Sequence, residues 1–201
     1  MIFDTHCHYN LSPLYENWQQ HWQKAQQHGV IKSIVPGTNI ETSQQAIEIE
    51  VEFKEQLQDV YDSYILMTEA FVASDAEEVS RKALSVRSVL KKVDMGLLQG
   101  EAHMEWMTQI EKLNESIDQI SDSKDISDQR LLFAAFNTTF HTSLKSFDLQ
   151  QGTTYYQYCP MANGDEGAYW FSNEKEIANP YFGEAMLKCG ETRETLDFSK
   201  R

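Results

Sequence analysis

Between residues 43 and 147 the chain contains four stretches with the spacing of amphipathic helices, and this spacing is the strongest constraint on the fold. In each stretch, apolar side chains recur three or four residues apart, as they do along one face of an α-helix. The third stretch carries Trp106, Ile110, Leu113 and Ile117 at this spacing. Such stripes are most simply the buried faces of packed helices. The sequence therefore predicts a mainly α protein, an up-down helical bundle. Its expected helices cover about residues 43–72, 75–93, 101–120 and 125–147.

Two of the predicted helices begin at residues suited to capping. Ser74 or Asp75 precedes the second helix, and Asp125 or Ser127 starts the fourth. Side-chain oxygens at this position accept hydrogen bonds from backbone N–H groups that the first helical turn leaves unpaired. We therefore expect well-defined starts for both helices.

From Gln151 onwards, a segment called the tail below, the composition changes. Its first residues, 152–158, are rich in strand-forming aromatic and β-branched side chains. Glycines and prolines then recur up to Gly190. Aromatic residues bury much area each. The sequence therefore predicts an ordered, mostly irregular tail that packs on the bundle.

The first 45 residues have a different texture. Ile2–Asp4 and Val30–Val35 have the composition of short strands, and Glu16–His28 has helical spacing. A strand, a helix and a second strand in this order predict a βαβ-like fragment with parallel strands. We therefore expect two parts, a βαβ fragment over 1–45 and the bundle with its tail over 46–201.

The charge of the chain disfavours two classes of partner. It carries 31 acidic and 17 basic side chains, a formal net charge of -14. Such a field repels nucleic-acid backbones and anionic lipid surfaces, so basic patches are not expected to bind nucleic acid. No apolar run approaches the roughly 20 residues that span a bilayer. The first residues do not resemble a secretion signal, so the chain as written predicts a cytoplasmic protein.

Sulfur-containing side chains form two short pairs in the tail: Cys159 with Met161, and Met186 with Cys189. Thiolate and thioether ligands suit Cu(I) and other soft cations. His103 and Met107, four residues apart on a predicted helix, would share one face and extend this set of metal ligands. Two other interpretations stay open. The two cysteines would form a disulfide or redox pair, or the methionines would simply fill gaps in the core.

A second set of possible ligands lies near the N-terminus. His6 and His8 follow the first expected strand. Side chains two residues apart in an extended chain point to the same side, so both imidazoles would be able to hold one divalent cation.

Residues 2–8, with Gly29-Val30 and 34–38, resemble the start of the TatD family of metal-dependent deoxyribonucleases. The resemblance implies that His6 and His8 bind one ion of a two-metal site that activates water for phosphodiester cleavage. It covers only the opening of such a barrel. After residue 42 the sequence offers only His103 and His141 as further histidines, both inside predicted helices. A TatD-like hydrolase is therefore the alternative function, and a protein that is not an enzyme is the leading expectation.

A larger resemblance covers residues 57–196. Its most distinctive parts are 158–163, 167–172, 177–183 and 186–190. These segments and the preceding helices resemble an uncharacterised bacterial domain of exported proteins, found also at the ends of CusB-like adaptors of heavy-metal efflux pumps. The resemblance implies copper handling, efflux components as partners, and the periplasm or cell envelope as location. A fusion of two pieces would explain why the two resemblances imply different compartments.

Overall fold

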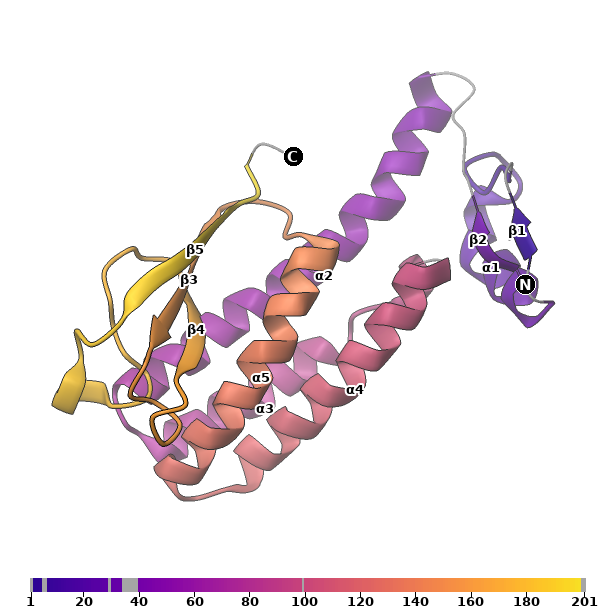
Figure 1. Cartoon of the computed structure of the whole chain (residues 1–201). Helices are drawn as coiled ribbons and strands as arrows, with labels where there is room; N and C mark the ends of the chain where they lie inside the picture. The colour runs from indigo at the N-terminus through magenta and orange to yellow at the C-terminus, as the bar shows by residue number, and fades with distance from the viewer. Residues whose placement is uncertain (1, 5–6, 29, 34–39, 99, 200–201) are drawn as a thin grey trace. The chain divides into compact units, whose positions relative to one another are not determined.

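The computed structural model describes residues 2–4, 7–28, 30–33, 40–98 and 100–199 (Figure 1). The chain divides into two compact units that alternate along the sequence. The first unit is Met1–Gln56 with Val93–Thr108, and the second is Leu57–Lys92 with Gln109–Arg201. The predicted division between residues 45 and 46 stays a prediction.

Four long helices confirm the predicted mainly α fold. They are α2 (Ile40–Val72), α3 (Ala76–Leu90), α4 (Gly100–Asp122) and α5 (Ile126–Phe147). In the second unit their apolar stripes form the core of a bundle. Many fully buried rings in this core come from α2, α5 and the tail: Tyr64, Phe71, Phe133, Phe136, Phe140, Trp170 and Phe171. Each such ring contributes roughly 1.5–3 kcal/mol through burial, so the aromatic stripes dominate the packing.

The predicted caps form at two helix starts. The Asp75 carboxylate accepts a hydrogen bond from the Glu78 N–H at 2.9 Å. The Asp125 carboxylate accepts from the N–H groups of Ser127 and Asp128 at 2.7 and 3.2 Å. These backbone donors lower the pKa of Asp125. The helix boundaries are therefore fixed by local chemistry that the sequence shows.

The buried side chain of Gln129 joins three helix ends of the bundle. Its Nε2 lies 3.0–3.3 Å from the carbonyl oxygens of Ala76, Ile120 and Ser123 and from the hydroxyl of Ser80. The Ile120 carbonyl belongs to the last turn of α4, where backbone acceptors have no helical partner. Gln129 therefore connects the start of α3, the end of α4 and the start of α5.

The tail forms a three-stranded antiparallel sheet, which corrects the prediction of a mostly irregular segment. Its strands are β3 (Thr153–Cys159), β4 (Ala168–Ser172) and β5 (Glu191–Asp197), in the order β4-β3-β5. The prediction failed because β5 is largely polar and because glycines and prolines interrupt the connections around β4. β4 packs beside α5, and a short 3-10 helix, η3 (Gly183–Met186), precedes β5 (Figure 1).

A buried chain of hydrogen bonds fastens the tail to the bundle. The Tyr64 hydroxyl accepts from the Phe171 N–H at 2.9 Å and donates to the side-chain oxygen of Asn137 at 2.6 Å. The Asn137 amide donates to the Tyr181 hydroxyl, which donates in turn to the Tyr169 carbonyl oxygen. Burial raises the pKa values of Tyr64 and Tyr181, so both phenols stay protonated donors. Helices α2 and α5 thus hold two segments of the tail.

The first unit contains the N-terminal elements. These are β1 (Ile2–Asp4), η1 (Tyr15–Asn17), α1 (Trp18–Gln27), β2 (Val30–Ser33) and, later in the chain, η2 (Met95–Leu97). Trp18 and Trp22 bury the apolar face of α1, and the Tyr9 ring packs edge-on against Trp22 at 6.1 Å. β1 and β2 pair in parallel, but they have three and four residues and an irregular register. So short a pair does not support the predicted βαβ fragment of a barrel.

None of the helices in the described ranges combines the length and the apolar character needed to cross a bilayer.

Candidate functional site

Two thiols that are distant in the sequence meet in the tail. Cys159 ends β3 and is fully buried, while Cys189 precedes β5 and is partly buried. Both are free cysteines, and their Sγ atoms lie 3.6 Å apart although 30 residues separate them along the chain. The structure therefore brings together the two cysteines that the sequence singled out.

The buried Asn179 positions the segment that carries Cys189. Its side-chain amide donates to the Cys189 carbonyl oxygen at 2.7 Å, and its side-chain oxygen accepts from the Tyr181 N–H at 2.8 Å. Its backbone N–H donates to the Leu187 carbonyl, and its carbonyl accepts from the Gly183 N–H. These four bonds close the connection between β4 and β5 into a compact loop. Cys189 is thus held in place and does not lie on a free chain.

Gly190 allows the Cys189 segment to approach β3. Its φ is +140°, a conformation that residues with a Cβ rarely adopt. A Cβ at this position would lie 2.9 Å from the Tyr158 carbonyl oxygen and 2.9 Å from Cη2 of Trp170. Because those contacts are too short, only glycine lets the backbone pass at this distance, and the spacing of the two sulfurs depends on it.

The surroundings of the pair disfavour a reactive thiolate. The hydrogen bond with Cys159, together with burial, raises the pKa of the Cys189 thiol. Nucleophilic cysteines have the opposite property, a lowered pKa beside cationic groups or helix N-termini. The raised pKa of Cys189 therefore disfavours its use as a nucleophile.

The sulfur spacing fits two kinds of chemistry. Two thiolates that bind one tetrahedral metal ion at about 2.3 Å each lie roughly 3.8 Å apart, close to the observed 3.6 Å. Sulfurs joined in a disulfide lie about 2.05 Å apart, so oxidation requires the two side chains to approach further. Both interpretations of the cysteine pair stay open on geometry.

The other predicted soft ligands occupy different places. Met161 lies in the turn after β3 with 47% of its surface exposed, and Met186 ends η3, half-buried, where its carbonyl oxygen accepts from the Cys189 N–H at 3.0 Å. His103 and Met107 lie four residues apart on the part of α4 that belongs to the first unit. Burial lowers the pKa of His103, which keeps its imidazole neutral. That these two join the cysteines in one site stays a prediction.

The N-terminal ligand set is described only in part. His6 lies outside the described residues. His8, which comes between β1 and η1 in the sequence, is partly buried. Within the described ranges no three histidine, cysteine or acidic side chains gather closely enough to hold a metal ion. Cooperation of His6 and His8 at a divalent cation stays a prediction.

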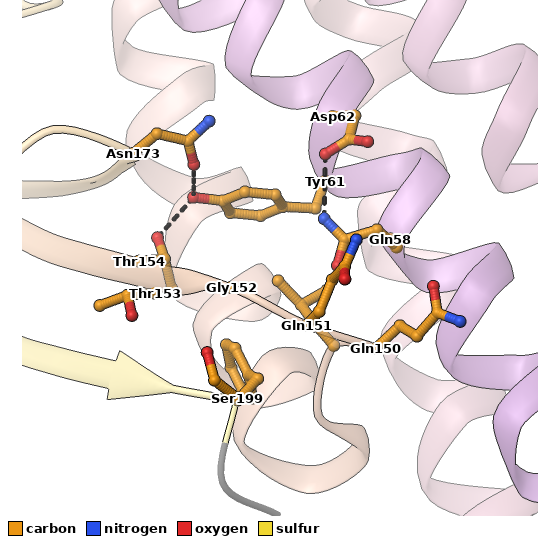
Figure 2. Close-up of a pocket in the computed structure, with 12 residues that line it drawn as sticks. Gln58, Tyr61, Asp62, Gln150, Gln151, Gly152, Thr153, Thr154, Asn173 and Ser199 are labelled. Carbon is orange, nitrogen blue, oxygen red and sulfur yellow. Dashed lines mark hydrogen bonds between the residues drawn. The ribbon is translucent and has the colours of Figure 1, made fainter.

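A polar pocket of about 700 Å³ lies beside the sheet (Figure 2). Its walls come from α2, from the connection between α5 and β3, and from the ends of β4 and β5. On α2 the Gln58 amide donates to the Asp62 carboxylate at 3.0 Å. Next to them the Tyr61 hydroxyl contacts Thr154 and Asn173 (Figure 2). The volume lies within the roughly 300–1,000 Å³ of ligand sites.

No sequence pattern indicates this pocket or the residues that support the thiol pair. Asn179 precedes a proline in the sequence, which indicates a turn, but nothing there shows that its side chain holds Cys189. The pocket residues are ordinary glutamines, asparagines and threonines from four separate segments. Only the folded chain brings them together.

Comparisons with known proteins support part of the expected relationship. Residues 60–152 match the model of a family described as Protein of unknown function (DUF3347). This span runs from α2 to the start of the tail and ends before Cys159. No curated protein and no solved structure matches the chain. The comparisons thus support an uncharacterised domain family for the bundle, and they do not support the resemblance to TatD nucleases or CusB-like adaptors.

Proposed function

We propose that this chain is a non-enzymatic metal-handling domain whose Cys159 and Cys189 together bind Cu(I) or another soft cation. The single observation that carries the proposal is the 3.6 Å separation of two free thiols 30 residues apart in the chain. The helical bundle serves as the scaffold, because Tyr64 and Asn137 anchor the tail in which both thiols lie.

The chemistry of the two ligands favours a soft cation. Thiolates bind Cu(I) and Zn(II) strongly, whereas Mg(II) and Ca(II) prefer oxygen ligands. The Met186 carbonyl oxygen accepts a hydrogen bond from the Cys189 N–H, which keeps the two residues close. Met161 follows Cys159 by two residues. A thioether from either methionine would add a third soft ligand. Among soft cations Cu(I) accepts such a sulfur-only set most readily.

Proton release gives the proposal a pH dependence. The pKa of the Cys189 thiol is raised, so this thiol stays protonated at neutral pH and the metal must displace its proton. The affinity for Cu(I) is therefore expected to fall as the pH decreases and to rise as it approaches the pKa of the thiol.

The test is a titration of the reduced full-length chain with Cu(I) against a competing Cu(I) chelator, without oxygen. One ion per chain is expected. The variant Cys159→Ser/Cys189→Ser is expected to lose more than about 100-fold in affinity, because changes to supporting groups around metal ligands already cost 10–100-fold. Cys7→Ser, which removes the third thiol, is the matched control and should bind as wild type.

Two further variants show whether a methionine is a third ligand. Met161→Leu and Met186→Leu keep an apolar side chain of similar size but remove the thioether, so a loss of affinity in one of them identifies a third ligand. If the double cysteine variant binds Cu(I) as tightly as the wild type, the proposed site is wrong. The link to metal-efflux components and to the cell envelope stays a prediction from the CusB-like resemblance.

A further inference from the structure

We propose that the polar pocket in Figure 2 is a binding site for a neutral, hydroxyl-rich ligand of the carbohydrate class. The inference is independent of the thiol pair. It rests on the charge of the pocket lining, on a shortage of hydrogen-bond donors within it, and on the mixed chemistry of its amide groups.

The charge of the lining disfavours anionic ligands. Among the described residues that line the pocket, Asp62 is the only charged one, although 24% of the chain is charged and about three of the twelve would be expected. The net charge of -14 further disfavours an anion. The pocket is thus lined mainly by neutral polar groups, with one carboxylate and the apolar side chains of Leu149 and Phe198.

With the Asn173 side-chain oxygen facing Tyr61, one set of contacts in the wall lacks a hydrogen-bond proton. The Tyr61 hydroxyl lies 2.5 Å from the Thr154 hydroxyl and 2.8 Å from the Asn173 side-chain oxygen (Figure 2). Thr154 also contacts the Ser172 carbonyl at 3.2 Å. These three contacts share only the two hydroxyl protons of Tyr61 and Thr154. When Tyr61 donates to Asn173 and Thr154 donates to Ser172, no proton lies between the two hydroxyl oxygens.

A ligand hydroxyl would correct this shortage. Asn173 is exposed, so a ligand O–H group can donate to its side-chain oxygen in place of Tyr61. The Tyr61 proton is then available to Thr154, and all contacts are satisfied. Because an acceptor without a donor is costly, the pocket favours ligands that bring donors to the exposed Asn173 side chain.

The amides in the wall favour hydroxyls over amines as these donors. Gln58, Gln151 and Asn173 carry both N–H donors and a carbonyl acceptor, so they pair best with groups that do both. A sugar hydroxyl donates and accepts, whereas an ammonium group only donates. A peptide backbone would pair with an open strand edge, whereas these lining groups are side chains from α2 and from residues next to the strands. A carbohydrate therefore uses more of the wall than either alternative.

The test is binding of the full-length chain, labelled at its amino terminus, to an array of neutral, sialylated and sulfated glycans, followed by calorimetry on the glycans that bind. Neutral glycans are expected to bind, and the anionic ones are not. Asp62→Ala should reduce affinity about tenfold or more, because it removes a charged acceptor. Asp59→Ala is the matched control, since Asp59 also lies on α2 but does not line the pocket, and its affinity should match wild type.

Three outcomes would overturn the inference. One is that no neutral glycan binds, and another is that Asp62→Ala and Asp59→Ala both bind like the wild type. The third is that spermidine or an extended peptide binds in an Asp62-dependent way while glycans do not, which would assign the pocket to another class of ligand. Circular dichroism of both variants shows whether their fold is kept.

Discussion

Oxidation of Cys159 and Cys189 to a disulfide is expected to stabilise the second unit by about 3.6 kcal/mol. The bond would close a loop across the 30 residues that separate the two cysteines. A crosslink removes entropy from the unfolded chain of about 2.1 + 1.5R ln n cal/mol/K, which for this span is about 12 cal/mol/K and about 3.6 kcal/mol at 25 °C. The midpoint of thermal unfolding should rise by roughly 7–14 °C.

The measurement compares urea unfolding of the reduced chain with that of the chain oxidised by glutathione disulfide. In this exchange the two protein thiols form one disulfide, and two molecules of glutathione are released. Intact mass should fall by two hydrogens, and neither cysteine should then react with an alkylating reagent. The Cys159→Ser/Cys189→Ser variant is the control, since the oxidant should not change its stability.

Two results would refute this reasoning. If the disulfide forms but the unfolding midpoint does not rise, the loop is already restricted in the unfolded chain or the bond strains the fold. If both thiols stay open to alkylation after the oxidant, the sulfurs do not lie within reach of each other in solution. The oxidised chain should also lose Cu(I) binding, because the same two sulfurs cannot serve as thiolate ligands.

Three further predictions concern the scaffold. Tyr64→Phe removes the hydroxyl that joins Asn137 to the tail and leaves buried polar groups without partners, so urea unfolding should show a loss of about 2–4 kcal/mol. Gln129→Leu should cost a similar amount by the same measurement, because it leaves helix-end carbonyls unpaired, whereas an unchanged midpoint would contradict this role. Lys145 and, less strongly, His141 lower the pKa of Glu194, so its contribution to stability is present above its unfolded pKa of about 4.3 and is lost as the pH falls through the lower folded pKa. The stability difference between wild type and Glu194→Gln should therefore shrink on acidification, and a constant difference would contradict the assignment.

The helices could be predicted from sequence because their signals are local. The stripe of Trp106, Ile110, Leu113 and Ile117 lies on one buried or nearly buried face of α4, as its spacing requires. The Asp125 cap is likewise recognisable from its neighbours alone. The sheet was missed because β5 is largely polar, and because strand pairing depends on partners elsewhere in the chain.

Only the residue types of the candidate site could be predicted from the sequence. The two cysteines proposed as ligands are visible in the sequence, but the contact of Cys159 with Cys189 depends on the pairing of β3 with β5, on Asn179 and on the positive φ of Gly190. No periodicity encodes such contacts. The proximity of the two thiols, and the pocket of Figure 2, therefore required the folded chain.

The hydrogen-bonded chain from Tyr64 through Asn137 to Tyr181 links the stability of the helices to the occupancy of the thiol pair. Tyr181 is bonded to Asn179, which holds the loop of Cys189. A ligand that binds only the folded state stabilises it by RT ln(1 + [L]/Kd), and amides that exchange only through global unfolding sense that gain. Slowed hydrogen exchange in the middle of α2 and α5 would therefore indicate that a cation is bound to the sulfurs, although those amides belong to the helices and the sulfurs to the tail.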